Sequence, residues 1–142
     1  MRVLIIANSR FKGGLSGGDA IYESFKKYWD AEFVTWEMQE IDYKPFLVCY
    51  MHRIFSGIIR SLTVPIYFDI VYSASDFLPD VLPSIFLKIR GVKWIAGYYL
   101  TAFKENKLHY YSQILVRQLI KWFADMVIVT NTTMLDIFLK KN

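Results

Sequence analysis

The sequence predicts a single α/β domain, a Rossmann-like, doubly wound parallel sheet with helices on both faces. Apolar runs of strand length alternate along all 142 residues with amphipathic segments of a dozen or more residues. Such alternation is typical of βαβ units, whose crossovers are right-handed. The first run, at about residues 2–8, is apolar on both faces, which is typical of a central parallel strand. No repeat or low-complexity tract interrupts the pattern.

The first half of the chain carries two expected strands and two expected helices. The strands lie at about residues 2–8 and at Glu32–Trp36, and the helices at about 19–29 and 46–62. In the first helix, the apolar residues recur at helical spacing and the charged residues lie opposite them. Two of the four elements are strands, each followed by a helix, as a parallel sheet requires.

The second half continues the alternation. Strands are expected at 69–74, 92–98 and 125–130, and helices at 80–90, at 107–123 and from about residue 131. Pro83 is expected in the first turn of the 80–90 helix, where a missing N–H costs nothing. Gly91 is expected to end that helix at the C′ position.

Composition limits the class of protein. The chain is 54% hydrophobic and 18% aromatic, which excludes a disordered chain and suggests that some apolar surface meets something beyond its own core. The net charge of +4 suits an anionic partner without selecting one. Cys49 is the only cysteine, and we expect a buried thiol in a reducing compartment. No signal peptide is visible, so a cytoplasmic location is expected, with the inner face of the membrane as a further option.

The segment at 46–62 is the most apolar helix. Its first interpretation is a helix buried between the sheet and a neighbouring helix. The alternative is an interfacial helix whose Arg53 and Arg60 contact anionic lipid headgroups. A membrane span over 46–68 is not expected, because two arginines, a histidine and a proline interrupt it.

The carboxyl ends of the strands are where an open parallel sheet binds its ligands. After the first strand comes a glycine-rich loop whose candidate phosphate- or substrate-binding residues are Gly13, Gly14, Ser16, Gly17 and Gly18. The loop matches neither the G-x-G-x-x-G fingerprint nor a Walker A motif. A flexible connection followed by a helix cap at Asp19 is the structural alternative.

The later strands end in hydroxyl, amide and carboxylate side chains. The candidate binding residues there are Ser73, Ser75, Asp76, Tyr98, Tyr99 and Asn131. This hydroxyl-rich, aromatic rim suits a carbohydrate or a phosphate better than a metal ion. Asn131 is interpreted first as a helix N-cap.

Acid–base, metal and nucleic-acid functions find less support. Asp76 is open to a ligand role, whereas Asp80 is interpreted first as the N-cap of the helix that follows. His52 and His109 lie far apart and are expected on helix surfaces, so we expect no metal site and no catalytic triad. No nucleic-acid-binding signature is visible, and no such partner is expected.

Four segments together resemble the N-terminal domain of GT-B glycosyltransferases, in particular the retaining group called family 4 or group 1. They are the loop Gly13–Asp19, the strand Asp69–Ser73 with its following loop, the strand Val92–Ala96, and Ala124–Asn131. They occur in the family's order and together span nearly the whole chain. The chain departs from the pattern after the fourth strand, where many members carry a histidine and this chain reads Gly97-Tyr98-Tyr99-Leu100. A tyrosine cannot supply a histidine's proton chemistry near neutral pH.

The resemblance implies that residues 1–142 form the acceptor-side domain of a nucleotide-sugar-dependent glycosyltransferase. The acceptor would be a glycan, a lipid or a small molecule. A C-terminal domain, absent from this chain, would hold most of the nucleotide-sugar substrate, so this chain alone would not transfer sugar. No cofactor or metal is implied, and no catalytic residue is assigned. The alternatives are a Rossmann-like binding module without catalysis and a peripheral membrane scaffold.

Overall fold

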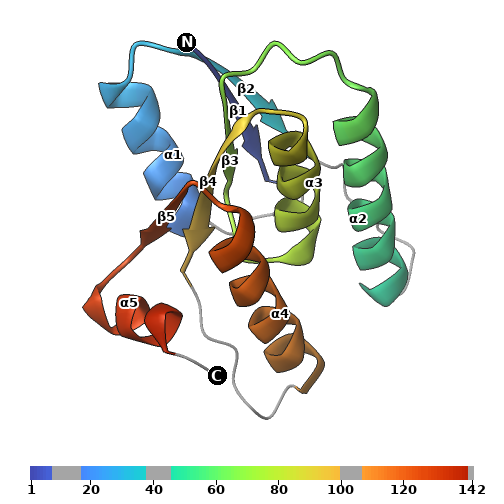
Figure 1. Ribbon diagram of the computed structural model, residues 1–142, viewed down its shortest axis with the longest axis vertical. Coiled ribbons are helices and arrows are strands. Elements are labelled where there is room, and N and C mark those ends of the chain that lie inside the picture. The colour runs from blue at the N-terminus through green and yellow to red at the C-terminus, as the bar shows by residue number, and fades with distance from the viewer. Residues whose placement is uncertain (8–16, 38–45, 100–106, 141–142) are drawn as a thin grey trace.

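The computed structural model describes residues 1–7, 17–37, 46–99 and 107–140, and within these ranges strands and helices alternate (Figure 1). The elements are β1 (Arg2–Ile6), α1 (Gly17–Tyr28), β2 (Glu32–Trp36), α2 (Phe46–Thr63), β3 (Ile70–Ser73), α3 (Leu78–Ile89), β4 (Lys93–Tyr98), α4 (Lys107–Phe123), β5 (Met126–Val129) and α5 (Thr132–Leu139). Every expected boundary lies within two residues of the observed one. The predicted α/β fold class is confirmed.

The five strands form one parallel sheet in the order β2-β1-β3-β4-β5. Helix α1 lies on one side of the sheet, and α2, α3 and α4 lie on the other (Figure 1). The chain therefore reverses its winding direction between β1 and β3. Such a reversal is the topological switch point at which doubly wound sheets bind ligands.

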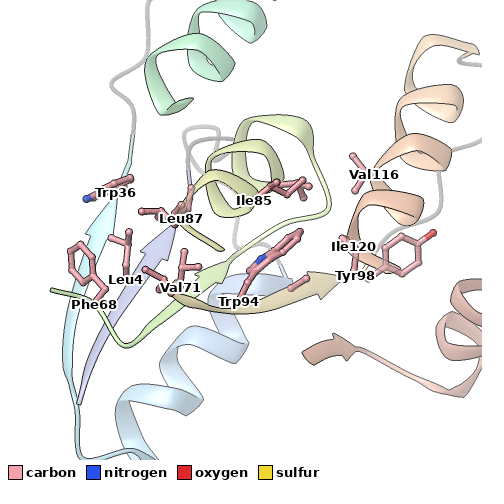
Figure 2. Close-up of a cluster of buried hydrophobic side chains, with 14 of the residues drawn as sticks. Leu4, Trp36, Phe68, Val71, Ile85, Leu87, Trp94, Tyr98, Val116 and Ile120 are labelled. Carbon is pink, nitrogen blue, oxygen red and sulfur yellow. The ribbon is translucent and has the colours of Figure 1, made fainter. Parts of the chain in front are cut away.

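The main core fills the space between the sheet and the layer of α3 and α4. Trp94 of β4 lies at its centre, with Val71, Ile85 and Ile120 among its neighbours in the cluster (Figure 2). A second cluster on the other face includes Ile5 and Tyr72 of the sheet, with Phe25 of α1 packed against it. The alternation of side chains along each strand sends them into these two clusters, as expected for a sheet covered on both faces.

The start of α3 differs from the expectation. The N-cap residue is Phe77, which makes no side-chain cap, so the prediction that Asp80 caps the helix is wrong. Pro79 occupies the first turn, whereas Pro83 lies inside the helix and not in its first turn as predicted. A proline is tolerated in the first turn because its nitrogen needs no partner there, and Pro79 therefore moves the start of the helix ahead of Asp80.

The end of α3 is as predicted. Gly91 has φ of +99°, its N–H donates to the Lys88 carbonyl, and the Val92 N–H donates to the Leu87 carbonyl. These two hydrogen bonds form a Schellman motif, in which glycine supplies the left-handed backbone at no steric cost.

Helix α2 packs against α3 and not between the sheet and a neighbour. Its buried face carries Ile54 and Ser61, and Arg90 at the end of α3 donates a hydrogen bond of 2.5 Å to the Ser61 carbonyl. Other apolar side chains of α2 remain exposed, including Phe55 and Ile59. The prediction that this helix is buried on both sides is therefore wrong.

Candidate functional site

A cluster of buried polar side chains lies at the carboxyl ends of β3 and β4, beside the switch point. Its centre is Asp76, which lies in the turn between β3 and α3 and is only 1% exposed. Asp76 Oδ2 accepts a hydrogen bond of 3.0 Å from Nε2 of Gln113 on α4. A buried carboxylate needs such partners, because desolvation of its charge is costly.

The charge of Asp76 affects the pKa of three tyrosines. Burial raises the pKa of Tyr50 on α2, a backbone hydrogen bond at Leu78 opposes the rise, and the charges of Asp80 and then Asp76 add to it. Burial also raises the pKa of Tyr98 at the end of β4, and the charge of Asp76 raises it further. Burial raises the pKa of Tyr99 to about 12; a hydrogen bond with the Tyr72 hydroxyl opposes this rise, and Asp76 adds to it. All three phenols are therefore neutral at physiological pH and can act as hydrogen-bond donors.

The second carboxylate, Asp80, secures the turn that carries Asp76. Ser75 Oγ donates a hydrogen bond of 2.5 Å to Asp80 Oδ2, and the Phe77 N–H donates to Ser75 Oγ over 3.3 Å. Asp80 is fully buried, and its backbone carbonyl also accepts from the Ser84 hydroxyl. These bonds fix Ser75 and the preceding end of β3 relative to α3.

Ser73 and Asn131 have structural partners. Ser73 is fully buried and accepts a hydrogen bond of 3.1 Å from the indole Nε1 of Trp94, so it lies inside the core and not on the predicted rim. The Asn131 side chain accepts from the Met134 N–H over 2.9 Å, which confirms its prediction as the N-cap of α5. Asn131 is exposed, and its observed role is to cap α5.

Most of the glycine loop falls in a part of the chain that the structure does not describe. Gly13, Gly14 and Ser16 lie outside the described residues. Gly17 and Gly18 form the first turn of α1, which begins beyond the carboxyl end of β1. Of the predicted residues, Ser75 and Asp76 lie in one turn, Tyr98 lies in the main core and Tyr99 in the cluster on the other face of the sheet, and the charge of Asp76 acts on both tyrosines.

Sequence reasoning missed the site roles of Tyr50, Gln113 and Arg117. Gln113 and Arg117 lie in the expected helix at 107–123, to which no site role was assigned, and both are buried. Arg117 Nη1 donates to the Ile137 carbonyl of α5, and its positive charge opposes the rise in the pKa of Tyr98. The sequence offered one signal for their burial. Gln113 and Arg117 are spaced i, i+4, as are the apolar Val116 and Ile120, so the two pairs lie next to each other on one side of the helix.

The two arginines predicted to contact a membrane differ from each other. Arg53 is buried, which contradicts its predicted contact with lipid headgroups. Arg60 is exposed, and its guanidinium lies 4.4 Å from the centre of the Trp36 ring. Across the described part of the chain, no helix is long and apolar enough to cross a membrane.

Metal chemistry finds no support in the described residues. Within them, no group of three or more histidine, cysteine, aspartate or glutamate side chains is arranged to hold a metal ion. His52 is exposed on α2, as expected, with Nε2 3.4 Å from the Ser56 hydroxyl. The side chain of His109 lies outside what the structure describes.

The fold and the site define a Rossmann-like α/β domain with a buried polar cluster at the carboxyl edge of its sheet. Comparisons with protein-family models, with curated proteins and with solved structures each gave no match.

Proposed function

We propose that this chain is the acceptor-binding domain of a nucleotide-sugar-dependent glycosyltransferase. The observation that carries the proposal is the Asp76 cluster, which combines a carboxylate with neutral tyrosine hydroxyls beside the switch point of the sheet. Buried polar groups cost stability unless they are well satisfied, and a sheet edge can be closed with apolar side chains instead. A polar cluster at the one edge where this fold class binds ligands therefore favours a binding function.

The chemistry of the cluster suits a sugar. A carboxylate accepts hydrogen bonds from sugar hydroxyls, and a protonated phenol both donates and accepts. Tyrosine rings also offer apolar surface to the face of a pyranose. In this proposal Asp76, held by Gln113, orients an acceptor hydroxyl, and Tyr98 and Tyr99 supply the surrounding contacts.

Catalysis in this proposal comes from positioning the acceptor against a donor that a further domain would hold. The resemblance in the glycine loop and in the strand Ala124–Asn131 supports this assignment, and it extends over most of the sequence. A Rossmann-like binding module that takes a small anion without chemistry is the alternative.

Ligand-detected NMR with the chain tests the proposal. The probes are a panel of mono- and disaccharides, nucleoside diphosphate sugars and inorganic phosphate. We expect at least one saccharide to bind and Asp76→Asn to weaken that binding at least tenfold. Asp136→Asn, an exposed aspartate on α5, is the matched control and should bind as the wild type does. Binding of phosphate but no saccharide would favour the alternative, and unchanged saccharide binding by Asp76→Asn would exclude the assigned role.

A further inference from the structure

We propose that the exposed side of α2 binds the surface of a membrane that contains anionic lipid. The helix presents an apolar row to solvent, called here the outward row. It comprises Val48, Met51, Phe55, Ile59 and Leu62. These side chains are between 40% and 61% exposed, and their spacing of three and four residues places them on one face of the helix.

Two more apolar side chains are exposed just after α2. Ile66 and Tyr67, in the segment that leads to β3, are also exposed. The opposite side of α2 is occupied, because Ile54 and Ser61 face the protein and α3 packs there. Scattered exposed apolar side chains are normal on a protein, but a continuous row along a whole helix marks an interaction surface.

Charge favours a lipid surface over a second copy of this chain. From Phe46 to Phe68 the sequence has no acidic residue. The exposed Arg60 lies on the flank of α2, about 100° around the helix from Ile59, with its guanidinium over the Trp36 ring, and His52 is exposed one turn from Phe55. Partial burial lowers the pKa of Arg60, but a guanidinium stays protonated at neutral pH. Anionic headgroups complement this surface, while a second copy would bring a like-charged surface against it.

The geometry fits a helix that lies in the plane of the interface. With 18 residues, α2 is about 27 Å long at a rise of 1.5 Å per residue. Its outward row can enter the boundary between headgroups and acyl chains while α3 supports its other side. Arg53 takes no part, because it is buried. This inference does not rest on the proposed function, since the outward row and the Asp76 cluster involve different side chains.

Vesicle flotation tests the proposal. The probes are vesicles of phosphatidylcholine with about one third phosphatidylglycerol, and vesicles of phosphatidylcholine alone. The test variant is Phe55→Glu/Ile59→Glu. The charge-matched control is Tyr28→Glu/Leu139→Glu, which alters two exposed apolar residues on α1 and α5. Phe55→Ser/Ile59→Ser removes the apolar contact without adding charge, and circular dichroism checks that each variant is folded.

We expect the wild type and the control to float with the anionic vesicles and to bind neutral vesicles more weakly. The glutamate variant should lose at least tenfold in vesicle partitioning, the serine variant should lose in the same direction, and Arg60→Gln should reduce the preference for anionic lipid. A wild type that stays off anionic vesicles, or test variants that bind as the control does, would overturn the proposal. A wild-type dimer in sedimentation velocity that only the test variants dissociate, with equal vesicle binding throughout, would assign the row to a second copy instead.

Discussion

Gln113 on α4 donates a hydrogen bond of 3.0 Å to Asp76, and the two residues are 37 positions apart in the chain. The bond joins the turn after β3 to the helix after β4 across the carboxyl edge of the sheet. Both residues are at least nine-tenths buried, so the bond operates away from bulk water. It therefore contributes to stability as well as to the position of the carboxylate.

Replacement of Gln113 should be costly. Gln113→Leu removes the Nε2 donor from a buried carboxylate, and the loss of one such partner typically costs about 1–3 kcal/mol. We expect a reduction of that size in the free energy of unfolding, measured by urea denaturation. Gln118→Leu on the same helix is the control, because Gln118 is only half-buried. Equal losses from the two substitutions would show that the contact with Asp76 contributes nothing specific.

Alkaline pH should destabilise the protein through Tyr99. Its pKa is raised from 10.0 in the unfolded chain to about 12 in the folded protein, mainly by burial. A raised pKa gives stability that is fully present below pH 10 and is lost as the pH rises towards 12. One such group can lower the free energy of unfolding by at most about 1.4 kcal/mol for each pH unit in this range.

The free energy of unfolding, measured at intervals across this alkaline window, checks the prediction. Tyr99→Phe should be less stable near neutral pH, because the hydrogen bond with Tyr72 is lost, but its stability should fall less steeply above pH 10. Tyr28→Phe, at an exposed position on α1, should keep the wild-type slope. Parallel curves for Tyr99→Phe and the wild type would contradict the assignment.

Gly97 is required for steric reasons. A Cβ added there would lie 2.6 Å from the Tyr99 hydroxyl, so Gly97→Ala should displace the Tyr99 ring and cost about 1–3 kcal/mol. Gly91→Ala is an instructive comparison, because nothing lies within 4 Å of its Cβ and the cost there comes from the positive φ alone. Because Tyr99→Ala removes the ring that the added methyl group would meet, Gly97→Ala should cost less in the Tyr99→Ala background than in the wild type. Thermal unfolding measures all of these changes, and a Gly97→Ala variant as stable as the wild type would exclude the predicted clash.

Acid should destabilise the protein through Asp125. Its Oδ1 accepts from Lys88 Nζ over 2.5 Å and its Oδ2 accepts from the Trp94 N–H over 2.7 Å. The bond from Lys88, followed by the bond from Trp94, lowers the pKa of Asp125 below 3.8. A lowered pKa gives stability that is present above pH 3.8 and is lost as the pH falls through the folded value.

Asp125→Asn should therefore be less stable than the wild type near neutral pH, and the difference should shrink on acidification. The effect is modest, because the side chain is 40% exposed and solvent screens the ion pair. Urea denaturation at several acidic pH values measures it, with Asp136→Asn as the control. A stability difference between Asp125→Asn and the wild type that stays constant with pH would contradict the predicted loss of stability in acid.

The alternation of strand-like and helix-like segments in the sequence predicts the fold closely, because the period of the apolar residues and the length of each segment distinguish strands from helices here. Glu32–Trp36 and Lys107–Phe123 are observed with the expected bounds. Local sequence was insufficient at Asp80, where an aspartate that suits an N-cap lies beside a proline that suits the first turn. The proline determines the start of the helix, and Asp80 instead binds Ser75, a contact between side chains that neither propensity nor periodicity encodes.

The candidate site was predictable only in part. Ser75, Asp76, Tyr98 and Tyr99 follow from their places at strand ends, because parallel strands bring those ends to one edge. The inward direction of Gln113 depends on how α4 packs, which a mixed stripe of polar and apolar residues does not determine. The same holds for α2, whose apolar residues nearly surround the helix and so leave its buried side undefined.

Trp94 of β4 makes hydrogen bonds toward both of its neighbouring strands, β3 and β5. Its backbone N–H donates to Asp125 before β5, and its indole N–H donates to Ser73, the last residue of β3. The indole is fully buried in the main core (Figure 2), so its proton can exchange with deuterium only when that core opens. A single slowly exchanging indole resonance would thus report, without any label, how often the core opens beneath the carboxyl end of β3.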